Sequence, residues 1–166
     1  MKKGFTLIEL MIVITIIGIL ASSAVLLSIN FSQNVKINTA TQDIRAFLYS
    51  SRSQAQSVVS SQCNGSVFTG ISIVFCNSKD KNNISCSTTQ CQNNGNPDYE
   101  MELLCNNSVV ATLDKKLLPG GITVTPDSCS VLFQSFTNPV VGNGAIIING
   151  YNKTKTITVT NTGVIQ

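Results

Sequence analysis

The feature that most limits how this chain can fold is the apolar run at residues 5–29, FTLIELMIVITIIGILASSAVLLSI. As an α-helix the run extends about 37 Å, which is enough to cross the ~30 Å hydrocarbon core of a bilayer. Glu9 lies inside this run, where an acidic side chain is costly to place in lipid. An acid at such a position indicates a functional site, so Glu9 should have a partner.

Three interpretations of the amino terminus compete. A cleaved secretory signal would have a shorter apolar stretch and no acid within it. A plain signal anchor would use Lys2 and Lys3 to hold its leading end in the cytoplasm, but it gives Glu9 no role. The third interpretation depends on a sequence resemblance, and it accounts for the basic leader, the Gly4–Phe5 junction and the acid together.

The segment KKGFTLIEL, followed by an apolar helix, resembles the amino terminus of type IV pilins and type II secretion pseudopilins. The resemblance implies that a prepilin peptidase cuts after Gly4 and methylates the new amino terminus, Phe5. It also implies that Glu9 pairs with the amino-terminal amine of a neighbouring subunit during assembly. The implied partners are other pilins or pseudopilins, contacted through the helix, the peptidase, and an inner-membrane assembly platform.

The same resemblance implies a location and a division of the chain. A single-pass subunit would lie in the inner (cytoplasmic) membrane with its head outside the cytoplasm, until it is extracted into a periplasmic or surface filament. The implied segments are a leader peptide at 1–4, a transmembrane and assembly helix at 5–29, an amphipathic helix half at 30–61, and a β-rich head with disulfides at 62–166.

Hydrophobic periodicity predicts the fold of the rest of the chain. After residue 29, apolar residues recur three and four positions apart, as on one face of a helix. We expect one helix from about Phe5 to about Ser61, because the first proline is Pro97 and Gly18 is the only glycine in that span. Later segments alternate with a period of two, which predicts strands. The expected fold class is α+β, a long helix packed on an antiparallel sheet, with strands at 67–75, 99–104, 109–113, 122–124, 130–136, 145–149 and 155–160.

The strand expected at 99–104 carries acids on one face, Asp98, Glu100 and Glu102. We interpret these acids as a solvated strand face. A calcium site is the alternative, but same-face positions are about 7 Å apart, too far for all three acids to bind one ion unaided. We expect no metal and no cofactor. After this strand, Asn106-Asn107 predicts a tight hairpin turn, because asparagine tolerates positive φ.

The chain contains six cysteines and no histidine. An even number of cysteines outside the cytoplasm predicts disulfides, whereas a zinc site would need closely spaced cysteine pairs or histidines that are missing. Sequence cannot choose among the connectivities. The expected set joins cysteines that follow one another along the chain: Cys63 with Cys76, Cys86 with Cys91, and Cys105 with Cys129.

Composition argues against an enzyme. Without histidine, neither a Ser-His nor a Cys-His nucleophile pair is available, and no glycine-rich phosphate loop follows a strand. Charged residues make up 11% of the chain, against a typical ~25%. Removal of Lys2 and Lys3 with the leader lowers the formal net charge from +3 to +1, so no strong electrostatic partner is implied.

The order of SRSQAQS, LLPGGITV, VLFQSF and a terminal hairpin with TITVTNTGVI resembles the GspH/FimT class of minor pilins and pseudopilins. That resemblance implies a structural subunit of a type IV pilus or a type II secretion pseudopilus. The alternatives are a major pilin and a pilus-borne adhesin or DNA-uptake receptor. Some FimT-like subunits bind DNA through an arginine-bearing tail. Here only Lys153 and Lys155 lie near the tail, so nucleic-acid binding should be weak.

Overall fold

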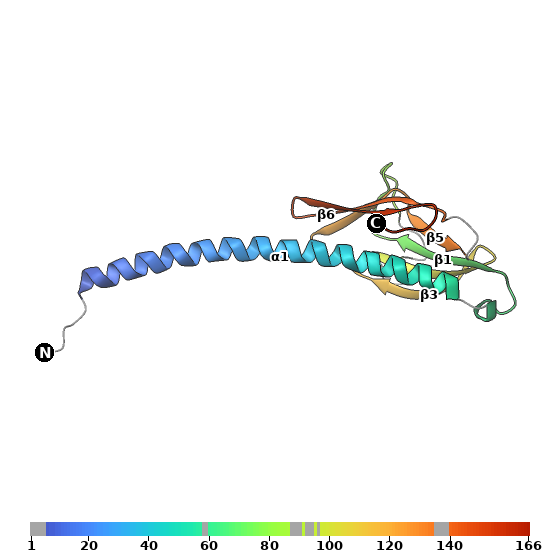
Figure 1. Cartoon of the computed structure of the whole chain (residues 1–166), viewed down its shortest axis with the longest axis horizontal. Coiled ribbons are helices and arrows are strands. Elements are labelled where there is room, and N and C mark those ends of the chain that lie inside the picture. The colour runs from blue at the N-terminus through green and yellow to red at the C-terminus, as the bar shows by residue number, and fades with distance from the viewer. Residues whose placement is uncertain (1–5, 58–59, 87–90, 92–94, 96, 135–139) are drawn as a thin grey trace. The chain divides into compact units, whose positions relative to one another are not determined.

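The computed structural model describes residues 6–57, 60–86, 91, 95, 97–134 and 140–166. An α-helix, α1 (Leu7–Ser57), is followed by a short 3₁₀ helix, η1 (Ser60–Cys63), and then by β-strands (Figure 1). The chain divides into two compact units, Met1–Lys36 and Ile37–Gln166. The combination of a long helix and antiparallel sheets confirms the α+β fold class, which is consistent with a type IV pilin.

Helix α1 ends at Ser57 rather than near Ser61. The chain turns after η1, where Asn64 and Gly65 adopt positive φ angles of 46° and 87°. The serine-rich end of the helix has low helix propensity, so the turn prevails there. In the first unit, the side chains of residues 6–22 are exposed. Among the described residues, no helix is both long enough and apolar enough to count as a membrane span, so the single-pass location stays a prediction.

The second half of α1 carries the predicted apolar stripe, and its described members are buried. They pack against the inward-facing side chains of the strands in one hydrophobic core. Phe47 of α1 meets Tyr99 edge to face, with ring centroids 4.9 Å apart. Val58, which continues the predicted helical spacing three residues after Ala55, lies outside the described residues. The buried members are Ile37, Ala40, Ile44, Phe47, Leu48, Ser51 and Ala55.

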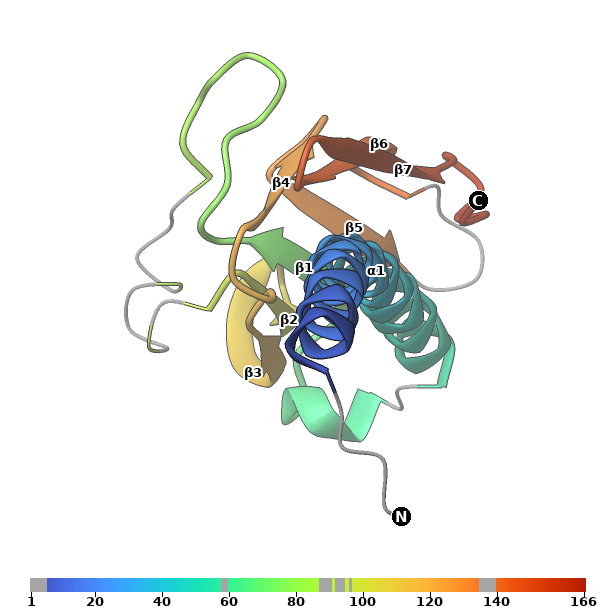
Figure 2. The same cartoon turned by 90° about the vertical axis from the view of Figure 1, so that its left-hand side faces the viewer.

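The strands form two antiparallel sheets rather than one. Figure 2 shows β6 and β7 grouped apart from β1, β2 and β3. The four-stranded sheet has the order β3-β2-β1-β5 and the three-stranded sheet the order β4-β6-β7. Their bounds are β1 Phe68–Phe75, β2 Tyr99–Cys105, β3 Ser108–Lys116, β4 Ile122–Pro126, β5 Ser130–Gln134, β6 Gly144–Gly150 and β7 Lys153–Val159.

Two tight turns connect neighbouring strands. Asn106 and Asn107 join β2 to β3 with φ angles of 49° and 61°, which confirms the predicted hairpin turn. Tyr151 and Asn152 join β6 to β7 with φ angles of 54° and 59°. Positive φ at both central residues matches the right-handed twist of the flanking strands.

The six cysteines form three disulfides, but the expected pairing is wrong. The bridges are Cys63–Cys105, Cys76–Cys91 and Cys86–Cys129. The order of the strands explains the difference. Phe68 pairs with Cys105, so the chain entering β1 reaches the end of β2. At the other end of β1, the amide of Phe75 donates to the carbonyl oxygen of Cys129, which brings β5 close to the segment that follows β1.

Candidate functional site

A capping box begins helix α1. The backbone N–H and the Oγ1 hydroxyl of Thr6 both donate to Oε2 of Glu9, at 3.0 and 2.8 Å. In return, the amide of Glu9 donates to Thr6 Oγ1 at 3.3 Å. Thr6 is therefore the N-cap residue and Glu9 the third helical residue, the arrangement in which threonine and glutamate satisfy each other's backbone donors.

Glu9 thus has a partner within its own chain, and sequence reasoning missed Thr6. The signal was present, because threonine followed three residues later by glutamate before an apolar run is typical of a helix start. Oε2 of Glu9 carries both bonds from Thr6, whereas within residues 6–57 Oε1 accepts no hydrogen bond. The carboxylate is exposed, and within the described residues one of its oxygens is left for a cation. The processing residues Gly4 and Phe5 lie outside the described residues.

The helix surface around Glu9 and after it is apolar on every side. Its large hydrophobic side chains have exposed fractions between 45% and 78%. Soluble proteins rarely expose so continuous an apolar surface unless it binds lipid or protein. The exposed side chains are Leu7, Ile8, Leu10, Met11, Ile12, Val13, Ile14, Ile16, Ile17, Ile19 and Leu20.

The acidic face of β2 is not solvated, contrary to the prediction. Glu100 and Glu102 are 0% and 4% exposed. They lie on the side of the sheet opposite to α1, where the Cys76–Cys91 disulfide packs with Val74 in a second, smaller cluster. The prediction failed because the Cys76–Cys91 disulfide, which joins two residues outside the strand, packs against this face.

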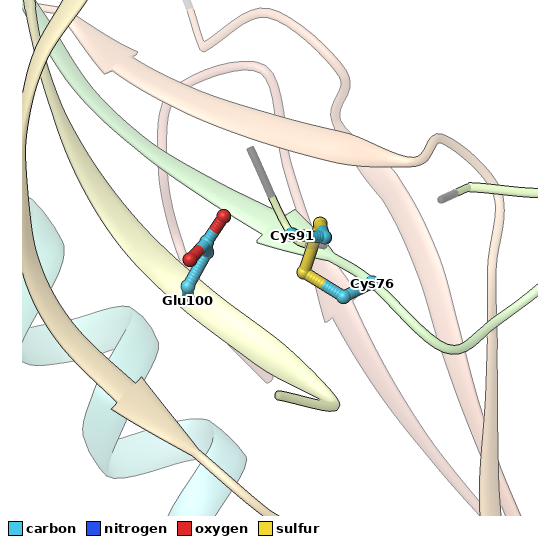
Figure 3. A group of neighbouring side chains, drawn as sticks. All are labelled: Cys76, Cys91 and Glu100. Carbon is cyan, nitrogen blue, oxygen red and sulfur yellow. A yellow bond between two sulfur atoms is a disulfide. The ribbon is translucent and has the colours of Figure 1, made fainter. Parts of the chain in front are cut away.

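Cys76, Cys91 and Glu100 form a compact group whose side-chain sulfur and oxygen atoms lie within 4.8 Å of one another (Figure 3). A soft metal ion would bind the two cysteines as thiolates. Both sulfurs are consumed in the disulfide between Cys76 and Cys91. The group therefore does not fit a metal ion while this bridge is intact.

Lys153 and Lys155 are both exposed on β7. Lys155 lines a pocket of about 250 Å³ together with Arg45 of α1. The remaining lining residues are polar and uncharged, so two cations face one small volume. Sequence reasoning missed Arg45, because only the fold brings the helix beside β7. The polar lining residues are Asn38, Thr41, Gln42 and Thr156.

Comparison with known proteins identifies the class of the amino terminus. Residues 1–25 match the family model described as the prokaryotic N-terminal methylation motif. This match indicates a type IV pilin-like prepilin, a subunit that a prepilin peptidase processes and that assembles with other pilins. Pilin-like subunits are structural and in general not enzymes. No curated protein and no solved structure shows significant similarity to the chain.

Proposed function

We propose that the chain is a minor pilin or pseudopilin of the GspH/FimT-like kind, in a type IV pilus or a type II secretion pseudopilus. The observation that carries this proposal is the methylation motif at residues 1–25, which overlaps helix α1 from Leu7 onward, where the first turns expose apolar side chains all round. Such a surface has to be covered by lipid before assembly and by other helices after it.

The proposal assigns a role to each part of the chain. Residues 1–4 are a leader, 5–29 anchor the subunit in the membrane and then in the filament core, and 30–61 support the head at 62–166. The three disulfides support a head outside the cytoplasm, since such bridges persist in oxidising compartments.

Glu9 is the proposed assembly residue. Its Oε2 atom is held by Thr6, and its Oε1 atom, which accepts no hydrogen bond within residues 6–57, would accept one from the methylated amine of a neighbouring Phe5. A carboxylate in an apolar bundle is tolerable when it is paired and hydrogen-bonded. The pair would therefore set how far one subunit is displaced along the filament relative to the next.

The processing step gives the first test. In cells that have a prepilin peptidase, the mature chain should begin at Phe5 and carry one added methyl group, as measured by peptide mass. A Gly4→Leu variant should keep its leader, because a bulky residue replaces the glycine that precedes the cut. A wild-type chain that begins at Val25, as after removal of a secretory signal cut behind the small residues Ser22-Ser23-Ala24, or one that still begins at Met1, would contradict the pilin proposal.

Abundance separates a minor from a major subunit. Quantitative mass spectrometry of sheared filaments should find this chain at a small fraction of the main pilin. If the chain were the dominant band, the minor-pilin part of the proposal would be wrong and the subunit would be a major pilin.

A second candidate function, binding of DNA during uptake, is favoured by the pocket that joins Arg45 to Lys155. The double variant Arg45→Gln/Lys155→Gln should bind DNA more weakly and lower the salt slope of log K by about 2, one unit for each lost phosphate contact. Lys79→Gln, which removes an exposed lysine outside this pocket, is the control. Equal salt slopes for the double variant and the wild type would refute this candidate.

A further inference from the structure

Two buried acids lie side by side on strand β2. Glu100 and Glu102 project from the face of the sheet opposite to α1, while Tyr99, Met101 and Leu103 point into the main core. Fully buried acids are rare unless they are paired with a cation, a metal or a proton.

The neighbours of this pair are mostly uncharged. Across the sheet on β1, Val74 pairs with Glu100 and Ser72 pairs with Glu102. The Cys76–Cys91 disulfide lies beside Glu100 on the outer side (Figure 3). These groups exclude water from the two acids and supply no positive charge.

Among the described residues, few charged groups lie on the strands next to this pair. On β3, Thr112 pairs with Glu102 and Lys115 pairs with Glu100, and the Lys115 side chain is exposed to solvent. Immediately before β2, Asp98 adds a further acid, which accepts hydrogen bonds from Asn77 and from the Leu118 amide. The sequence from 82 to 97 contains no ionisable side chain except the disulfide-bonded cysteines.

A bound proton would remove the negative charge from one of the two buried acids. Glu100 and Glu102 lie two residues apart on the same buried face of the sheet, and two carboxyl groups buried so close together favour the protonated form of one of them. Within the described residues, Oε1 of Glu102 has no hydrogen-bond partner, so ionised Glu102 would lack the partners that a buried charge needs. Burial, together with the neighbouring Glu100, raises the pKa of Glu102 to about 7.

We propose that Glu102, buried beside Glu100, is a proton-binding site, which the folded head fills with one proton and which loosens strand β2 when that proton leaves. The sign follows from linkage. Between pH 4.5 and about 7, the folded site still holds its proton, whereas the same carboxyl group in the opened strand has lost it. The equilibrium constant for opening β2 therefore increases as the pH rises through this range. Above about pH 7 the constant no longer changes with pH.

Hydrogen exchange measures this opening. The sample is the full-length chain in detergent micelles, and the reporters are the backbone amides of β2. The amides of Cys76 and Asp98 also report on opening of the strand, because each donates a hydrogen bond to a backbone carbonyl. After correction for intrinsic exchange, the opening constant should rise by up to about tenfold per pH unit between pH 4.5 and 7. Glu102→Gln, which keeps the shape without the charge, should make the opening constant independent of pH.

Two further measurements keep the proposal falsifiable. Asp43→Asn, which neutralises an exposed acid on α1, should leave the pH dependence of opening unchanged. Infrared spectra of the wild type at pH 6 should show a protonated carboxyl group that is absent from Glu102→Gln, and a wild type without that band would overturn the proposal even if the variant does not fold. Calorimetric binding of calcium chloride at neutral pH, lost in Glu102→Gln, would also overturn it, because the pair would then be a cation site.

Discussion

Glutamine in place of Glu9 should leave membrane insertion and peptidase cleavage intact and remove the subunit from filaments. Glutamine can still accept the hydrogen bonds from Thr6, because either residue completes a capping box. It cannot neutralise the amine of a neighbouring subunit. Breaking one buried charge pair costs about 3–5 kcal/mol, so incorporation should fall by more than about a hundredfold. Immunoblots of sheared filaments against whole cells would measure it.

The matched control removes the capping box and keeps the charge. In Thr6→Ala the side-chain bonds between Thr6 and Glu9 are lost, at a cost of about 1 kcal/mol to the helix start. This variant should still enter filaments. If Glu9→Gln assembled normally and Thr6→Ala did not, Glu9 would act by starting the helix, and the proposed pairing between subunits would be wrong.

Removing the Cys63–Cys105 bridge should cause a large loss of stability. The bridge closes a 42-residue separation, and loop-closure entropy for a loop of that length is worth about 4 kcal/mol, against about 3 for the 15-residue Cys76–Cys91 loop. We therefore expect Cys63→Ala/Cys105→Ala to lower the free energy of unfolding by about 4 kcal/mol, measured by guanidinium unfolding of the full-length chain in detergent.

A comparison of the two disulfides tests the loop-entropy argument more sharply than the loss of either one alone. Cys76→Ala/Cys91→Ala removes two buried cysteines in the same way but opens the shorter loop. It should therefore be less destabilising than Cys63→Ala/Cys105→Ala. A larger loss for the shorter loop would show that local packing, rather than the constraint on the unfolded chain, sets the contribution of these bridges.

The elements that sequence predicted well are those fixed by local pattern. The stripe from Ile37 to Ala55 follows from helical spacing alone, since the apolar face of a helix has to be buried. The Asn106–Asn107 turn follows from backbone preference. Strand starts and ends agree closely for β1 and β2, where alternation is clear, and less well for β3 and β7.

The features that sequence could not predict depend on which strands become neighbours. The partner of Cys63 is Cys105 because β2 pairs with β1, and no local pattern encodes that pairing. Likewise, the surroundings of buried Glu100 include the Cys76–Cys91 disulfide, whose two residues lie outside β2. Arg45 joins Lys155 only through the packing of helix and sheet. Thr6 is different, because its capping box was readable in the sequence.

The crossed pattern of the disulfides has a consequence for how the subunit matures. A head that leaves the cytoplasm in chain order presents Cys76 to Cys63 well before Cys105, the native partner of Cys63, has emerged. The first bridges formed by rapid oxidation would then be incorrect and would have to be exchanged through mixed disulfides. Secretion of this head in quantity therefore calls for a host with an active disulfide isomerase, and not only an oxidase.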